Sequence, residues 1–142
     1  MQISPSVRLI AQAPDCPYGR LALFGVRRMA AGGICDAHAA HVFFTGFGIG
    51  FRRPLLLMRA FMTEMARTST RTIAVAPCCC PRITEAESAI LTALGLAAED
   101  PMAAHERFAG LLGAPDCASV TEGARAVAMG FADCGMPLAT AE

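Results

Sequence analysis

Apolar residues recur every three to four positions along most of this chain, which is the spacing of helices that bury one face. Capping residues, prolines and glycines mark where such helices begin and end: Thr84 with Glu87 forms a capping box, and Asp100 precedes a proline. The predicted helices run over about residues 18–31, 36–50, 54–67, 84–97, 100–113 and 119–135. Residues 6–11 and 71–76 lack this spacing and are expected to be extended, paired with each other or with a symmetry mate.

The connections between these segments are short, so we expect residues 1–142 to form a single domain. The predicted fold class is mainly α: a compact bundle of about six helices with one or two short extended segments. In the second predicted helix Phe43 lies on the side opposite His38 and His41, which predicts a buried aromatic face and a polar face. In the third, Leu56 lies among polar residues and is left for a partner or a neighbouring helix.

Composition adds an expectation about partners. Apolar residues make up 54% of the chain and charged residues only 17%, which leaves apolar surface beyond what one core needs. We therefore expect self-association into a homo-oligomer. The formal net charge is zero, which removes the usual electrostatic basis for nucleic-acid binding.

The chain also lacks a recognisable targeting signal. Its most apolar segment, residues 42–51, is too short to cross a bilayer and leads directly into Arg52 and Arg53. We therefore expect no membrane partner and a cytoplasmic location. The two arginines follow a glycine-rich turn and precede a helix, which makes them a weak candidate for anion binding.

Three consecutive cysteines, Cys78, Cys79 and Cys80, stand between two prolines just before a predicted helix. One interpretation is a metal site. His38 and His41 are three residues apart on a helix, so both imidazoles can reach one point, and thiolates from the cysteine block would complete a tetrahedral site for zinc or, as a less favoured variant, iron. Neither half has the paired spacing usual in zinc sites, so this signal is weak.

A second interpretation is thiol redox chemistry. The amides at the start of the following helix, together with Arg82, favour a thiolate in the cysteine block. A neighbouring thiol could then form a disulfide. Because a disulfide between adjacent residues closes a strained ring, the expected pair is Cys78 with Cys80, or one of them with a more distant cysteine.

A third interpretation is structural, because cysteine is among the residues most often buried. Cys134 falls on a helix face with Val127 and Phe131, which indicates core packing. Cys16 and Cys117 each end an Ala-Pro-Asp-Cys sequence before a predicted helix, which indicates a capping turn. In a chain with seven cysteines, an odd number, and no sign of secretion, a disulfide framework is not expected.

Catalytic motifs are missing from the sequence. It has no Gly-x-Ser-x-Gly elbow, phosphate-binding loop or dinucleotide fingerprint, and His105 is expected to be partly buried beside Phe108. A cysteine nucleophile would need His38, His41 or His105 as a base within hydrogen-bond reach. The favoured function is a non-catalytic binding or interaction module with a cysteine-rich turn. The alternative is a metal-binding or thiol redox-responsive protein.

The segments Arg-Arg-Pro-Leu at 52–55, Ala-Pro-Cys-Cys-Cys-Pro-Arg at 76–82 and Thr-x-x-Glu at 84–87 together resemble a small family of uncharacterised alphaproteobacterial proteins with a domain of unknown function. The resemblance covers roughly residues 14–98, and its most specific part is the Cys-Cys-Cys-Pro-Arg segment. It implies a bacterial, cytoplasmic protein and brings no established activity, cofactor or catalytic residue.

Overall fold

The computed structural model describes the backbone of residues 2–3 and all of residues 8–138. Its helical elements are α1 (Pro17–Gly32), α2 (Ala37–Phe47), the 3-10 turn η1 (Gly48–Phe51), α3 (Arg52–Thr68), α4 (Glu85–Leu96), α5 (Pro101–Leu112) and α6 (Ala118–Asp133). The strands are β1 (Gln2–Ile3), β2 (Leu9–Gln12), β3 (Ala74–Val75) and β4 (Arg82–Thr84). The prediction of a mainly α-helical fold is confirmed. None of the helices described has the length and apolar composition to cross a membrane.

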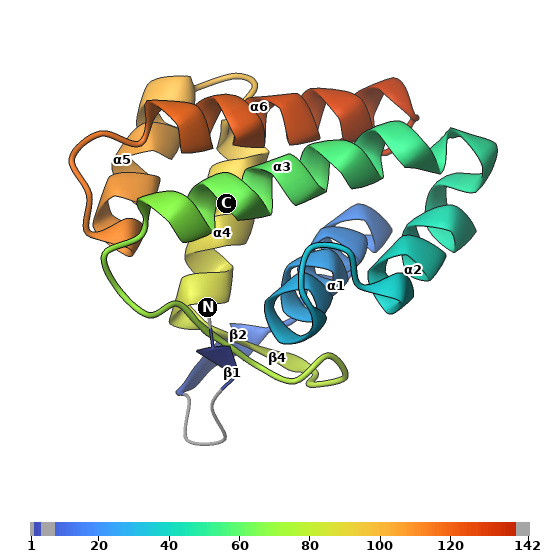
Figure 1. The fold of residues 1–142 in the computed structure, drawn as a ribbon, viewed down its shortest axis with the longest axis horizontal. Helices are drawn as coiled ribbons and strands as arrows, with labels where there is room; N and C mark the ends of the chain where they lie inside the picture. The colour runs from blue at the N-terminus through green and yellow to red at the C-terminus, as the bar shows by residue number, and fades with distance from the viewer. Residues whose placement is uncertain (1, 4–7, 139–142) are drawn as a thin grey trace.

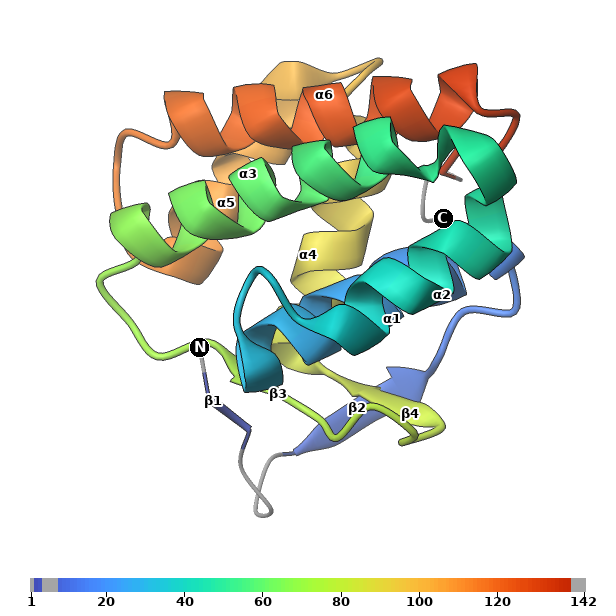
Figure 2. The ribbon, with the colours of Figure 1, turned by 45° about the vertical axis from the view of Figure 1, so that its right-hand side comes forward.

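Helices α3 and α6 run side by side along one side of the molecule, whereas α1 and α2 pack together on another and α4 crosses between them (Figures 1 and 2). A glycine lies at the contact between α3 and α6. A Cβ atom at Gly130 would lie 2.6 Å from Cδ1 of Leu57, so no larger residue fits without displacing that leucine. At one end of this contact Arg53 of α3 donates to Asp133, the last residue of α6, over 2.7 Å.

Aromatic and methionine side chains from several helices fill the core. Phe43 is completely buried and lies edge-on to Phe131 of α6, with ring centroids 5.9 Å apart. Phe61 of α3 contacts Phe108 of α5 in a tilted arrangement, with ring centroids 5.7 Å apart. The buried face predicted for residues 36–50 is therefore present in α2.

The two small sheets do not pair as predicted. Strand β2 pairs antiparallel with β4, and β1 pairs parallel with β3, so the described residues 8–11 are not paired with residues 71–76. Residues 6 and 7 lie outside the described part of the chain. Strand β4, which follows the cysteine block after Pro81, was not predicted, and only its last residue, Thr84, was expected as the start of a helix. The cysteine block therefore forms the connection between β3 and β4 and is fixed at both ends.

Most predicted helix starts are correct. Asp36 and Asp100 accept hydrogen bonds from the first turns of α2 and α5, and Thr84 with Glu87 forms the complete capping box of α4. The N-cap of α6 is Cys117, which ends the predicted capping turn, and the helix begins one residue before the predicted start at 119. Thr121 is buried inside the helix, where its hydroxyl donates to the carbonyl of residue 117 over 2.8 Å.

Candidate functional site

The cysteine block forms a tight turn at the protein surface. The backbone N–H of Cys80 donates to the carbonyl of Pro77 over 3.0 Å, which closes the turn. Cys79 is exposed, and Cys78 and Cys80 are half-buried. The Sγ atoms of Cys78 and Cys79 are 3.5 Å apart, so these two adjacent residues form a pair of thiols in contact.

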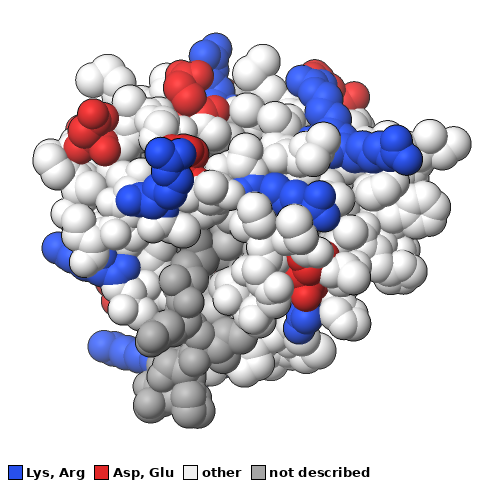
Figure 3. Space-filling model, viewed as in Figure 1, with Lys and Arg blue, Asp and Glu red and all other residues white. Residues whose placement is uncertain are grey.

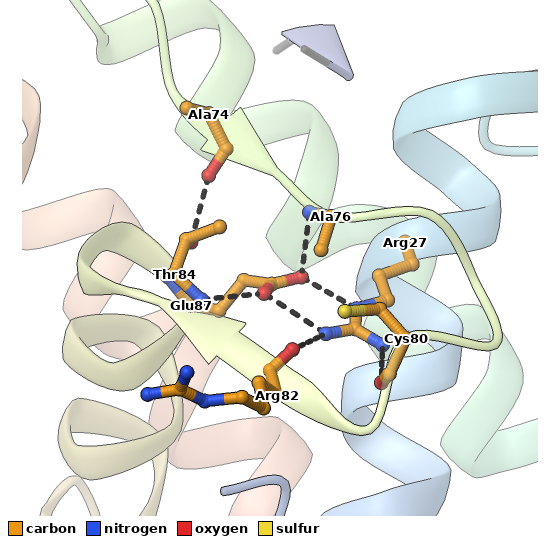
Figure 4. A network of polar contacts seen from close by, with 7 residues as sticks. All are labelled: Arg27, Ala74, Ala76, Cys80, Arg82, Thr84 and Glu87. Carbon is orange, nitrogen blue, oxygen red and sulfur yellow. Dashed lines mark hydrogen bonds and ion pairs between the residues drawn. The ribbon is translucent and has the colours of Figure 1, made fainter. Parts of the chain in front are cut away.

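A buried ion pair lies directly beneath this turn (Figure 4). Nε of Arg27, on α1, donates to Oε2 of Glu87, on α4, over 2.6 Å, and Nη2 donates to Oε1 over 3.0 Å. The side chains are 2% and 0% exposed, respectively. Two charges are withdrawn from water here, which a fold tolerates only where they are paired and fully hydrogen-bonded.

Glu87 meets this requirement through the backbone on both sides of the cysteine turn. Besides the two bonds from Arg27, its carboxylate accepts the N–H of Ala76 over 3.2 Å and the N–H of Thr84 over 2.9 Å. The Thr84 hydroxyl in turn donates to the carbonyl of Ala74 over 2.9 Å. A single carboxylate thus holds the segment before the turn and the segment after it.

Arg27 holds the turn itself. Its Nη1 donates to the carbonyl of Cys80 over 2.9 Å, and its Nη2 donates to the carbonyl of Arg82 over 2.8 Å. Together with the bidentate pairing to Glu87, these contacts connect α1, α4 and the cysteine turn through one guanidinium. The backbone beneath the thiols is therefore rigidly supported from the core.

The next residue along α1, Arg28, adds a positive charge on the side of the turn that faces α2. It donates to the carboxylate of Asp36 at 2.9 and 3.2 Å. This hydrogen bond is the main cause that raises the pKa of Arg28, and Cys78 contributes to the same shift. The hydrogen bond from Arg28 also lowers the pKa of Asp36. Arg28 therefore lies between the thiol pair and the N-terminus of α2.

The contact between the two thiols affects the pKa of Cys79. The hydrogen bond to Cys78, and then the charge of that residue, raise the pKa of Cys79 above its ordinary value.

The structure does not bring together the residues proposed for a metal site. His38 and His41 are both exposed on α2. His41 lines a groove of about 590 Å³ between α1 and α2, along with Arg20 and Thr45. Within the described part of the chain, no three side chains of His, Cys, Asp or Glu are arranged to hold a metal ion.

The weak anion site does not form as a pair of free arginines. Arg53 is engaged with Asp133, and both side chains are more than half exposed. Arg52 is exposed at the first residue of α3. An anion at this turn would therefore meet one uncompensated arginine rather than two.

Two further cysteines, Cys117 and Cys134, lie at the two ends of α6. Cys117 is completely buried, and burial raises its pKa, with a smaller contribution from Asp116. Its thiol donates to the carbonyl of Ala114 over 3.4 Å, while its backbone N–H donates to Nε2 of His105 over 3.2 Å. His105 is thus an acceptor for a helix start and does not serve as a base for this thiol. Cys134, expected in the core, is only half-buried just beyond the end of α6.

No buried or structural role was predicted for Arg27 or Arg28 from the sequence, and Glu87 was predicted only as a helix cap. One signal was available for Arg27, because it follows the buried Leu23 by four residues and so lies on the apolar face of α1. A charged residue on such a face indicates a buried partner. The sequence does not identify the carboxylate that pairs with Arg27, because Glu87 is 60 residues away along the chain.

The fold and this site together define a small helical domain that presents a supported pair of thiols on a surface turn. A family model described as "Family of unknown function (DUF6628)" matches residues 6–134, and the chain belongs to this family. A search of curated proteins and a search of solved structures each found no match.

Proposed function

We propose that the protein is a non-catalytic, cytoplasmic interaction module that responds to thiol redox conditions through Cys78 and Cys79. The observation that supports this is the 3.5 Å contact between the two Sγ atoms on a turn where one of the thiols is exposed. The oxidant would be a low-molecular-weight disulfide such as glutathione disulfide. The oxidised and reduced turns would present different surfaces to a partner.

The chemistry requires two exchange steps. A thiolate of Cys78 attacks one sulfur of the external disulfide, which forms a mixed disulfide and releases one small thiolate. The thiolate of Cys79 then attacks the Cys78 sulfur, forms the bond between the two residues and releases the second small thiolate. The two protein thiols lose two electrons and two protons in total, and the external disulfide is reduced to two thiols.

The geometry favours a reversible bond. A disulfide is about 2.05 Å long, so the sulfurs must approach each other by roughly 1.5 Å from their reduced positions. The ring closed by adjacent residues is strained, and strained or exposed disulfides are those that reduce readily. The contact between Cys78 and Cys79 supports this adjacent pair over the pair of Cys78 with Cys80 expected from the sequence.

The experiment is equilibration of the full chain in glutathione buffers of graded potential, followed by alkylation and peptide mass analysis. We expect a peptide that has lost two hydrogens and carries a bond between Cys78 and Cys79. The variant Cys79→Ser should lose this product, whereas Cys80→Ser, a matched control from the same turn, should keep it. The proposal fails if all three thiols stay alkylatable under oxidising buffers, or if Cys80→Ser alone abolishes the bond.

A further inference from the structure

The corner where α2 passes through η1 into α3 exposes three large apolar side chains. Ile49 is 96% exposed, Leu56 is 59% exposed and Phe44 is 51% exposed. Ile49 stands at the tip of the turn, between two glycines, and contributes almost nothing to the core. We refer to Phe44, Ile49 and Leu56 as the apolar corner. It lies at the opposite end of the molecule from α5 (Figure 1).

The segment that forms the apolar corner carries charged residues of one sign only. Residues 37–63 include no aspartate or glutamate and carry three arginines. Arg53 is compensated by Asp133, but Arg52 is exposed and has no ion-pair partner among the described residues. In Figure 3 the edge of the molecule where α2 meets α3 is mostly white, with blue side chains bordering it. This surface therefore combines an apolar tip, Ile49, with a positively charged side chain, Arg52.

We propose that the apolar corner rests on the surface of a bilayer that contains anionic phospholipid. The side chains of Ile49, Phe44 and Leu56 would enter the boundary between headgroups and acyl chains, and Arg52 would contact a lipid phosphate. A second copy of the chain fits this surface less well, because a symmetric contact there brings the Arg52 side chains of both copies together. The contact is peripheral, so it needs no membrane-spanning helix. This proposal differs from the expectation of no membrane partner, which considered only segments that could cross a bilayer.

The test is co-sedimentation of the reduced full chain with vesicles of phosphatidylglycerol and phosphatidylcholine at low salt. We expect binding to vesicles rich in phosphatidylglycerol and little binding to pure phosphatidylcholine. Ile49→Asp should lower the partition coefficient about tenfold, since it places a carboxylate at the tip. Arg52→Gln should weaken binding less, and should flatten its dependence on salt.

The matched control is Met102→Asn on α5, which removes another large apolar side chain, 77% exposed, from a distant surface. It should bind as the unchanged protein does, and thermal unfolding should confirm that each variant is folded. Leu56→Gln provides a second test of the corner if Ile49→Asp does not fold. The proposal is overturned if the unchanged protein fails to sediment, or if the control loses as much binding as the corner variants. It is also overturned if light scattering shows a dimer that Ile49→Asp converts to a monomer, because the occupant is then a second copy.

Discussion

Removing the charge of Glu87 should destabilise the fold more than any conservative change at the surface. In Glu87→Gln the side chain keeps its shape, but Arg27 becomes a buried cation without a counterion. The amide NH2 of the new glutamine also faces hydrogen-bond donors on at least one side, since all four current partners of the carboxylate are donors. The guanidinium cannot turn to water, because it is only 2% exposed.

The magnitude follows from the two contacts with Arg27. Each is a hydrogen bond between charged groups, of a kind that contributes about 1.5–3 kcal/mol. Two such bonds give about 3–6 kcal/mol, in agreement with the roughly 3–5 kcal/mol measured when one partner of a buried ion pair is removed. A domain of ordinary stability has only about 5–15 kcal/mol in total, so Glu87→Gln should be close to the limit of folding.

The assay is urea unfolding at neutral pH in reducing buffer, followed by helical circular dichroism. With a slope of about 2 kcal/mol per molar urea, a loss of about 3–5 kcal/mol lowers the midpoint by roughly 1.5–2.5 M. The matched control is Arg53→Gln, which breaks an ion pair of similar length, 2.7 Å, whose side chains are 59% and 57% exposed. Arg53→Gln should lower the free energy of unfolding by at most about 1 kcal/mol.

A double variant distinguishes a true pair from two independent losses. Arg27→Met combined with Glu87→Gln should cost less than the sum of the single changes, because the ion pair is lost only once. The reasoning is refuted if Glu87→Gln costs no more than Arg53→Gln, or if the two single losses simply add.

Three further predictions concern helix ends. Asp36→Ala should cost about 1 kcal/mol at neutral pH by removing a cap and the partner of Arg28. Because the pKa of Asp36 is lowered in the folded protein, its contribution is complete above the usual aspartate range and disappears as the carboxylate is protonated in acid, so thermal unfolding of the two proteins should converge at low pH; a constant difference would contradict this. His105→Ala should cost about 1 kcal/mol by leaving the N–H of Cys117 without its acceptor, and His105→Gln should recover part of the loss in thermal unfolding. Gly113→Ala should cost more than about 1 kcal/mol, since φ is +65° there and a Cβ would lie 2.6 Å from a side-chain oxygen; an unchanged melting temperature would rule this out.

The features that could be predicted from the sequence are those set by residues within one helical turn. The capping box of Thr84 with Glu87 and the cap at Asp100 involve partners three residues away, so spacing alone identifies them. The burial of Phe43 follows from the period of one short segment in the same way. Such local preferences act wherever the segment lies in the fold.

Features set by distant partners could not be predicted. Strand β4 has only three residues and pairs with β2 over a separation of about 70 positions, and nothing in either segment specifies the other. Arg27 and Glu87 likewise meet only because α1 and α4 pack together. Hence the helical class was predicted correctly, whereas the strand pairing and the support beneath the cysteine turn were not.

For the candidate site, the sequence indicated the residue types but not which of them meet. The choice between Cys78 with Cys79 and Cys78 with Cys80 depends on the shape of the turn. That shape is fixed by the bond from the Cys80 N–H to Pro77 and by two carbonyls bound to Arg27, one from each side of Pro81. None of these backbone contacts can be predicted from the pattern of residue types.

The two carbonyls that Arg27 binds have a thermodynamic consequence. Under the proposed oxidation, a change in the backbone at residues 80 and 82 would strain the bonds from Arg27, the side chain that also pairs α1 with α4. The free energy of unfolding and the affinity of the two thiols for electrons would then be linked quantities. A substitution that loosens the arginine should make the disulfide easier to form, and a reductant that opens the disulfide should return stability to the whole domain.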